Sequence, residues 1–243
     1  RFVFRLFFAF MLLALLLGGA GAGLALWHFS RDLPAHAQLA DYVPPISTRV
    51  HAGDGRLLAE YATQNRQFLP VEAVPQRVID AFLSAEDKNF FDHPGIDPLS
   101  ILRAVIANLD RARDNRRPSG ASTITQQVAK NFLVGNEISM ARKIREAILA
   151  VRIEEALSKE RILELYLNEI YLGAGSYGVV AAGLNYFNKS LGELTVAEAA
   201  FLAALPKAPN NYHPVRHPAA AKARRDWVIQ RMQEDGVIDG DEA

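Results

Sequence analysis

A run of 22 residues without a charged side chain, from Leu6 to Trp27, constrains the fold of this chain more than any other part of its sequence. At about 1.5 Å per residue, a helix of this length reaches roughly 33 Å and matches a hydrocarbon core of about 30 Å. The run therefore predicts one membrane-spanning anchor, placed at residues 1–28. A cleaved signal peptide is the alternative, because Ala35-His36-Ala37 has the spacing of a cleavage site, although signal-peptide apolar regions usually span only about 7 to 15 residues.

The charges beside this run bear on its orientation. Arg1 and Arg5 precede it and Arg31 follows it, so the positive-inside rule favours, by a small margin, a cytoplasmic N-terminus and an outside body.

Composition excludes several classes of function. The 27 basic and 27 acidic side chains leave no net charge, so the basic surface that binds duplex nucleic acid is missing. The absence of cysteine removes thiolate catalysis, cysteine-ligated metals and disulfides. The six histidines form no His-Glu-x-x-His pair, and the sequence therefore assigns no metal ligand.

Residues 29–69 are expected to form a stalk and a small β region. The prolines Pro34, Pro44 and Pro45 favour an extended stalk over residues 29–45. The segments Ile46–His51 and Leu57–Tyr61 flank a glycine-containing gap and predict a β-hairpin.

Residues 70–243 have the periodicity of a mainly helical single domain. Helices are expected over residues 75–91, 98–110, 122–133, 139–157, 159–172, 176–187, 195–205 and 218–235. One basic loop, with Arg111, Arg113, Arg116 and Arg117, is either a solvated loop or a surface for anionic lipid or pyrophosphate.

The segment from Ala85 to Asp97 contains the first candidate for chemistry. Glu86 follows Ile79 by seven residues and Leu83 by three, so it falls on the apolar stripe of its helix. Partial burial would raise the pKa of this carboxyl group and make it a proton acceptor near neutral pH. The alternative is a helix-end glutamate satisfied by backbone amides, and for His93 a structural hydrogen-bonding role is favoured.

The segment from Gly120 to Asn131 predicts a helix start, because Thr123 and Gln126 have the spacing of a capping box. The free amides of such a start attract anions. The surrounding hydroxyl, amide and amine groups exceed what a cap requires and indicate a surface for sugar or phosphate.

A third segment places Arg142 and Lys143 one turn before Glu146, and these cations favour the ionised carboxylate. Glu86 and Glu146 should therefore have different roles, although an ordinary surface ion pair also accounts for the second set. Two further helical segments, Lys159–Val179 and Arg224–Met232, are expected mainly to pack in the core.

In order and spacing, the five segments resemble the five motifs of the peptidoglycan glycosyltransferase family, glycosyltransferase family 51. The anchor, the proline stalk and the segment STRVHAGDGRLLAEY are similar to the N-terminal part of a class A penicillin-binding protein of the 1A type. The resemblance implies a lysozyme-like large lobe and a small membrane-associated jaw lobe, after a transmembrane helix and a short β-hairpin region. It makes residues 70–243 the glycosyltransferase domain. The Ser-x-x-Lys and Lys-Thr-Gly strings of a C-terminal transpeptidase domain do not occur in these residues, so acylation by penicillin is not expected.

The resemblance also implies roles for residues. Glu86 matches the proposed general base and Glu146 a second essential carboxylate that orients substrate or supports the pyrophosphate. The substrate-binding set carried over by motif is Asp87, Phe90, His93, Gly95, Ser122, Thr123, Gln126, Gln127, Lys130, Asn131, Arg142, Lys143 and Arg145. One departure is Ile138, which stands where many relatives have arginine; Arg145 or the basic loop around Arg116 is expected to compensate.

The implied reaction is polymerisation of lipid II into β-1,4-linked glycan strands, with inversion and release of undecaprenyl pyrophosphate. The implied partners are lipid II, the nascent glycan strand, the bacterial membrane and cell-wall synthesis proteins. No cofactor is required, and magnesium or manganese would bind through the substrate pyrophosphate. The implied location is the cytoplasmic (inner) membrane, single-pass, with the catalytic domain on the outer, periplasmic side. The rival functions are a membrane-anchored lysozyme-like glycan-cleaving enzyme and a non-catalytic cell-wall scaffold.

Overall fold

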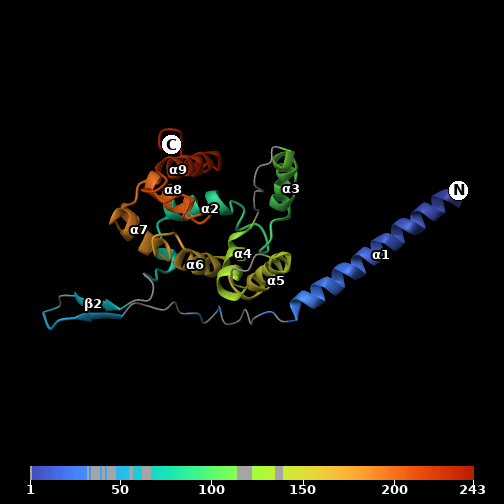
Figure 1. Cartoon of the computed structure of the whole chain (residues 1–243), viewed down its shortest axis with the longest axis horizontal. Coiled ribbons are helices and arrows are strands. Elements are labelled where there is room, and N and C mark those ends of the chain that lie inside the picture. Colours follow the sequence, from blue (N-terminus) through green and yellow to red (C-terminus); the bar gives the residue numbers. More distant parts are fainter. Residues whose placement is uncertain are drawn as a thin grey trace.

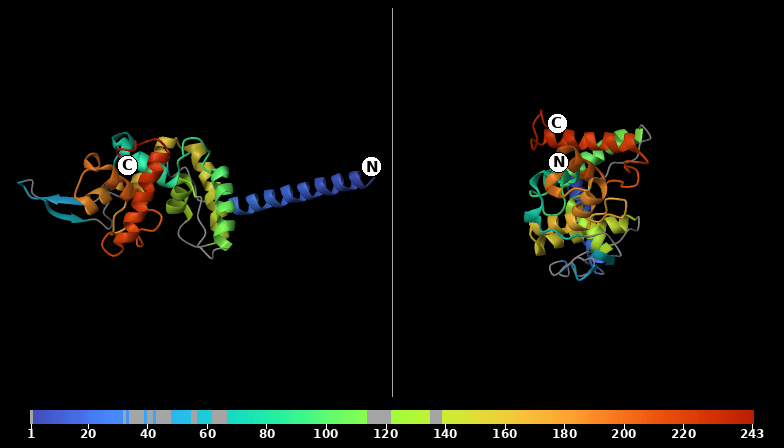
Figure 2. Two further views of the ribbon diagram at one scale, coloured as in Figure 1. Left: turned by 90° about the horizontal axis from the view of Figure 1, so that it is seen from above. Right: turned by 90° about the vertical axis from the view of Figure 1, so that its left-hand side faces the viewer.

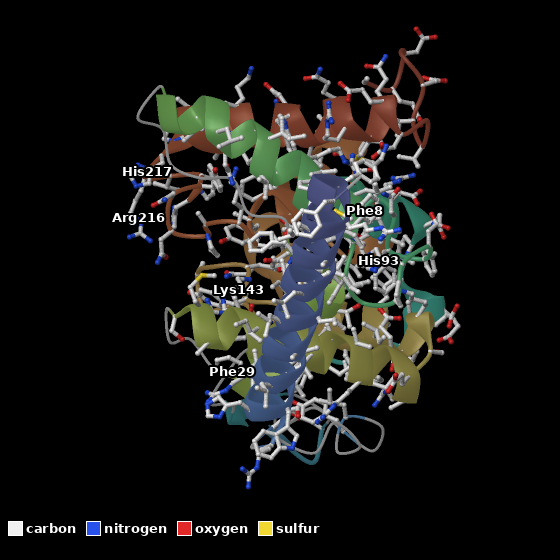
Figure 3. The ribbon with its side chains drawn as sticks, turned by 90° about the vertical axis from the view of Figure 1, so that its right-hand side faces the viewer. Phe8, Phe29, His93, Lys143, Arg216 and His217 are labelled. Atoms are coloured by element: carbon white, nitrogen blue, oxygen red, sulfur yellow. The ribbon has the colours of Figure 1, made fainter. Side chains whose placement is uncertain are left out.

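Helix α1 (Phe2–Ser30) projects from the body of the molecule with its side chains exposed (Figure 1). In the part of the chain that the structure describes, it is the one helix long and apolar enough to cross a membrane. Phe8 lies near its outer end and Phe29 near the end that meets the body (Figure 3). An apolar helix at the predicted anchor is therefore confirmed, and it extends two residues beyond the expected boundary.

The computed structural model describes residues 2–31, 33, 39, 42, 48–54, 57–61, 67–113, 122–134 and 139–243. Several predicted features lie outside these residues: Pro34, Pro44, Pro45, Gly55, the basic loop around Arg116 and Arg117, and Ile138.

The predicted hairpin is confirmed. Strands β1 (Thr48–His51) and β2 (Leu57–Tyr61) pair antiparallel, with Thr48 opposite Tyr61. The hairpin and α1 lie at opposite ends of the long axis of the molecule (Figure 2).

Two described positions of the predicted stalk pack against the body. Leu39 is buried in the core. Tyr42 places its ring edge-to-face on Phe132, with centroids 4.8 Å apart, and its hydroxyl donates to Glu169 Oε1 at 2.9 Å. The expected extended stalk stays a prediction, and at these two positions it is attached to the helical body.

The mainly helical body is confirmed. Its elements are a short 3-10 turn η2 (Val71–Ala73), α2 (Gln76–Glu86), α3 (Pro98–Arg113), α4 (Ile124–Ala129), the π-helix η3 (Lys130–Val134), α5 (Met140–Ala156), α6 (Lys159–Glu169), α7 (Val179–Phe187), the 3-10 turn η4 (Leu191–Glu193), α8 (Val196–Ala204) and α9 (Pro218–Glu234).

The expected helix over residues 75–91 ends early, at Glu86. Asp87 leaves the helical region with φ −161° and ψ 74°, and its carboxylate turns toward another segment. Two further expectations are corrected: the segment 122–133 divides into α4 and the π-helix, and the helix expected to reach residue 172 ends at Glu169.

The core joins two groups of helices. Helix α2 packs against α8 and α9, and α4 packs against α5 and α6 (Figure 1). Four fully buried alanines of α8 leave room for close approach of the neighbouring helices: Ala199, Ala200, Ala203 and Ala204. The C-terminal end of α2 and the N-terminal end of α4 meet between the two groups, and both predicted motifs lie at this junction. The division into a lysozyme-like lobe and a jaw lobe stays a prediction.

Candidate active site

Glu86 is the last residue of α2 and is partly buried. Phe82, one turn earlier on the same face, is fully buried, which agrees with the predicted position of Glu86 on the apolar stripe. Glu86 Oε2 accepts a hydrogen bond of 2.8 Å from Gln127 Nε2 on α4. Burial raises the pKa of Glu86; the hydrogen bond from Gln127 and the charges of Arg224 and Lys207 oppose this rise, and the neighbouring Asp87 adds to it.

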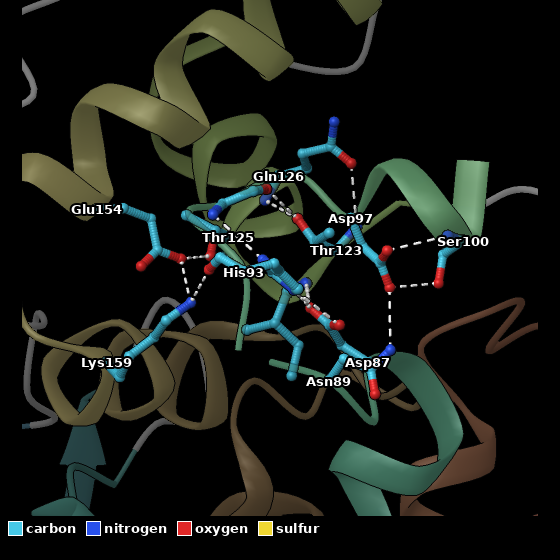
Figure 4. A network of polar contacts seen from close by, with 12 residues as sticks. Asp87, Asn89, His93, Asp97, Ser100, Thr123, Thr125, Gln126, Glu154 and Lys159 are labelled. Carbon is cyan, nitrogen blue, oxygen red and sulfur yellow. Dashed lines mark hydrogen bonds and ion pairs between the residues drawn. The ribbon is translucent and has the colours of Figure 1, made fainter. Parts of the chain in front are cut away.

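Asp87 joins the end of α2 to the start of α4. Its carboxylate accepts hydrogen bonds from His93 Nε2 at 3.0 and 3.1 Å and from the backbone N–H of Ile124 at 2.9 Å (Figure 4). His93 Nδ1 accepts from the N–H of Gly95, which assigns the imidazole proton to Nε2. Burial raises the pKa of Asp87 despite these hydrogen bonds. The buried pair of Asp87 and His93 therefore connects the loop after α2 to the start of α4.

The predicted capping box at the start of α4 is confirmed. Thr123 Oγ1 accepts from the N–H of Gln126, and Gln126 Oε1 accepts from the N–H of Thr123. The Thr123 hydroxyl also donates to the carbonyl of Gly95 at 2.7 Å. The expectation of free amides for an anion is wrong for Ile124 and Gln126, because Asp87 and Thr123 already accept from them.

Gly95 lies directly against α5. Its φ is +89°, and a Cβ at this position would stand 2.7 Å from the carbonyl oxygen of Ala150. Both facts require glycine, since an L side chain is strained at this φ and would meet backbone.

A second polar network, centred on Lys159, holds the loop between α2 and α3. Lys159 Nζ donates to the carbonyl of His93 at 2.6 Å and to Glu154 Oε1 at 2.7 Å (Figure 4). It also lies 4.4 Å from the ring centroid of Phe90, which is fully buried. Thr125 Oγ1 donates to the same Glu154 oxygen at 2.6 Å. Phe90, His93 and Gly95 therefore make contacts that fix the conformation of this loop. Direct contact of these three residues with substrate stays a prediction.

Asp97 begins α3. Burial opposes ionisation of its carboxyl group, but hydrogen bonds from the side chain and backbone of Ser100 and from Asn89 outweigh it and lower the pKa to about 2. The ionised carboxylate of Asp97 therefore caps the N-terminal end of α3.

Glu146 lies on α5 and is fully buried, so the alternative of a surface ion pair is wrong. It forms ion pairs with Arg142 and, at 2.7 Å, with Lys143 Nζ. Lys143 Nζ also donates to Ser122 Oγ at 2.8 Å. Burial lowers the pKa of Lys143, as do the nearby charges of Arg142 and Lys130. Lys130, Arg142 and Lys143 are called the cationic cluster below: Arg142 and Lys143 pair with the buried carboxylate, and the charge of Lys130 acts on Lys143.

Most of the predicted site residues gather in two places, near Glu86 and near Glu146. Gln127 and Lys130 belong to the continuous stretch of α4 and the π-helix, which links the two carboxylate sites. Arg145 lies about 100° around α5 from Glu146, and none of the interactions described for the resolved side chains joins it to the cationic cluster. Asn131 is exposed.

Two cations near Glu86, Lys207 and Arg224, were not predicted as site residues. Lys207 follows α8, and Arg224 lies on α9 with its guanidinium carbon 3.7 Å from the ring centroid of Trp227. Both modulate the pKa of Glu86. Arg224 belongs to the fifth sequence motif, and this could have indicated that it is a site residue. Nothing in the sequence around Lys207 indicates a role in the site.

The fold and this pair of carboxylate sites define a mainly helical protein in which one partly buried and one fully buried glutamate lie in different surroundings. The transglycosylase family profile matches residues 54–233. The chain is 54% identical over 240 residues to penicillin-binding protein 1A of Rickettsia felis, covering 98% of this chain and 30% of that protein. It is 47% identical over 208 residues to penicillin-binding protein 1A of Aquifex aeolicus, covering 86% of this chain and 28% of that protein.

A solved structure, penicillin-binding protein 1A from Haemophilus influenzae, is similar with a TM-score of 0.44 and 28% identity, over 83% of this chain and 20% of that one. The chain belongs to the transglycosylase family. It spans about 30% of the length of the Rickettsia felis relative.

Proposed function

We propose that this chain is a peptidoglycan glycosyltransferase that polymerises lipid II into β-1,4-linked glycan strands and releases undecaprenyl pyrophosphate. The observation that carries the proposal is a pair of carboxyl groups in different surroundings: Glu86, whose pKa is raised by burial, and Glu146, which is fully buried and held by Arg142 and Lys143. Membership of the transglycosylase family supports it.

The proposed base is Glu86. Its carboxylate accepts the proton of the 4-hydroxyl of the acceptor N-acetylglucosamine while that oxygen attacks the anomeric carbon of the donor. Burial gives this carboxylate a higher proton affinity than an exposed glutamate has, and a base with a pKa closer to the working pH is more effective. Gln127 fixes the orientation of the carboxylate through its 2.8 Å hydrogen bond.

The proposed leaving-group site is the cationic cluster. As the bond from the donor carbon to the pyrophosphate breaks, negative charge develops on the departing phosphate oxygens. Cations already held in place stabilise this charge without reorganisation. Glu146 positions Arg142 and Lys143, since it contacts both. Attack from the side opposite the leaving group inverts the anomeric carbon.

Magnesium or manganese would be bound mainly by the substrate pyrophosphate. Among the described residues, no group of three or more histidine, aspartate or glutamate side chains is arranged to hold a metal ion.

We infer a single-pass protein of the bacterial cytoplasmic membrane, with α1 as anchor and the site on the outer side. Helix α3 supports a second membrane contact. Its exposed apolar side chains recur at helical spacing along one face: Leu99, Leu102, Val105, Ile106 and Leu109. The substrates would be lipid II and the growing strand, and cell-wall synthesis proteins are proposed as further partners.

The test is polymerisation of fluorescent lipid II by the detergent-purified chain, with a muramidase digest of the product. Wild type should form long muramidase-sensitive strands and Glu86→Gln should form none. Glu72→Gln is the matched control, because it makes the same chemical change at an exposed position and should remain active. Cleavage of preformed glycan without polymerisation would favour the hydrolytic rival, for which a buried glutamate is also suited. If the chain neither polymerises lipid II nor cleaves glycan, the result would favour a scaffold.

A further inference from the structure

Tyr42 lies between α1 and the β-hairpin in sequence, yet three of its groups contact the helical body. Its ring stands edge-to-face on Phe132 of the π-helix η3, with centroids 4.8 Å apart and ring planes at 82°. Its hydroxyl donates to Glu169 Oε1 at 2.9 Å, and its carbonyl accepts from Arg161 Nη2 at 2.8 Å. Glu169 and Arg161 both belong to α6. One residue from the segment before the domain therefore joins α6 to η3.

The α6 side of this contact is fixed by the core. Every residue from Ile162 to Glu169 is buried. Arg161 also pairs with Glu164, whose other carboxylate oxygen accepts from the N–H of Val71 at 3.1 Å. Helix α6 is therefore a rigid support to which Tyr42 is bonded near both ends of the helix.

The other side of the contact is a less common element. π-Helices are rare, occur mostly as single turns and are frequent at functional sites. Because this conformation is rare, contacts with other segments are expected to hold it. Helix η3 begins at Lys130, directly after α4, and packs against α5, the helix that carries Arg142 and Lys143. Phe132 follows Lys130 by two residues in the same turn, so a contact on Phe132 acts on the turn that sets the backbone position of Lys130.

We propose that Tyr42 is a positioning residue: it fixes η3 to α6 through Phe132 and so holds Lys130 beside α5. The segment between the anchor and the body then has a second role besides tethering, because it also places one cation of the cationic cluster. The catalytic meaning of this placement rests on the proposed function; the effect of Tyr42 on η3 does not.

Two variants separate the ring of Tyr42 from its hydroxyl. Tyr42→Phe keeps the ring on Phe132 and removes the hydrogen bond to Glu169, whereas Tyr42→Ala removes both. Tyr186→Ala is the matched control. Tyr186 on α7 is also partly buried, stands edge-to-face on Phe201 with centroids 5.4 Å apart, and donates a hydrogen bond of 2.9 Å to a backbone carbonyl.

The first experiment is hydrogen–deuterium exchange of the backbone amides of residues 130–134 in the detergent-purified chain. Exchange should be about tenfold faster in Tyr42→Ala than in wild type, because the aromatic contact that holds the turn is lost. It should change by less than about twofold in Tyr42→Phe and in Tyr186→Ala. If Tyr42→Ala fails to fold, Tyr42→Leu, which keeps an apolar side chain without the ring, takes its place with the same expected direction.

Three exchange results would overturn the proposal: unchanged exchange when the ring is removed, equal acceleration in Tyr186→Ala, and acceleration in Tyr42→Phe as large as that in Tyr42→Ala. The second would indicate a general loss of stability, and the third would assign the effect to the hydroxyl. None of these results depends on activity.

The second experiment measures kcat and KM for lipid II polymerisation by the same variants. A displaced Lys130 would stabilise the departing pyrophosphate less, so Tyr42→Ala should lower kcat about tenfold while KM changes by less than about twofold. Tyr42→Phe should restore most of the activity. An equal loss of kcat in Tyr42→Ala and Tyr186→Ala would overturn the positioning role. Inactive wild type would count against the proposed function, and amide exchange would still decide whether Tyr42 holds η3.

Discussion

Replacement of Gly95 by alanine is the sharpest test of how the loop of the first motif is held. At φ +89° an L residue costs roughly 1–2 kcal/mol. A Cβ 2.7 Å from the carbonyl oxygen of Ala150 also forces backbone apart, and overpacking of this kind costs about 1–3 kcal/mol. Gly95→Ala should therefore destabilise the chain by about 2–5 kcal/mol.

The matched control is Gly175→Ala. Gly175 also has a positive φ, +74°, but nothing lies within 4 Å of its added Cβ. This variant carries the backbone strain without the contact, and both variants gain equally from a stiffer unfolded chain. The difference between them, about 1–3 kcal/mol, isolates the approach of the loop to α5.

The assay is thermal unfolding by circular dichroism in detergent, together with the rate of lipid II polymerisation. Gly95→Ala should unfold at a temperature on the order of 5 °C below Gly175→Ala. It should also lose more activity, because the carbonyl of Gly95 accepts from Thr123 and its N–H donates to His93. Equal unfolding temperatures for the two variants would refute the reasoning from the close contact.

Three further predictions concern charge. Burial raises the pKa of Glu86 in the folded chain, so the fold loses stability as pH rises from the ordinary pKa of glutamate through this raised pKa. Glu86→Gln should therefore raise Tm at pH 8, with a gain that shrinks toward pH 4. A lower Tm at pH 8 would contradict this. The pKa of Asp97 is lowered to about 2, so the ionised carboxylate stabilises the fold above the ordinary pKa of aspartate, and this stabilisation is lost as pH falls through about 2. Asp97→Ala should therefore lower the free energy of unfolding by about 1 kcal/mol at pH 7 in denaturant titrations, and by much less at pH 2. Lys143→Ala removes the contacts to Glu146 and Ser122 and should lower kcat/KM at least tenfold. Arg145→Ala tests whether Arg145 compensates for Ile138, and wild-type turnover in this variant would exclude that role for Arg145.

Local patterns predicted the elements that depend on neighbours in sequence. The capping box of Thr123 and Gln126 needs residues three apart, and the place of Glu86 on an apolar stripe follows from helical periodicity. Both are found in the structure. The early end of α2 was not predictable in this way, because the partner of Asp87 is the N–H of Ile124, 37 residues away.

The burial of the site residues also depended on tertiary structure. The triplet around Glu146 is compatible with an exposed ion pair in sequence, and only packing against neighbouring helices makes the carboxylate fully buried. Lys159 lies 66 residues from His93, and Lys207 and Arg224 act on Glu86 from segments still further along the chain, so no periodic pattern encodes these contacts. The resemblance to a family supplied roles for residues, whereas the contacts described above supply physical reasons for their positions.

The attachment of Leu39 to the core sets a limit on distance. Leu39 comes nine residues after Ser30, the end of α1, and a fully extended chain of nine residues spans at most about 32 Å. Helix α1 also lies against α5, the helix that carries Glu146. A membrane anchor at α1 would therefore hold α5, and Glu146 on it, close to the membrane surface. A substrate with a lipid tail could react while its tail stays in the bilayer, and its search for the enzyme would be diffusion in two dimensions.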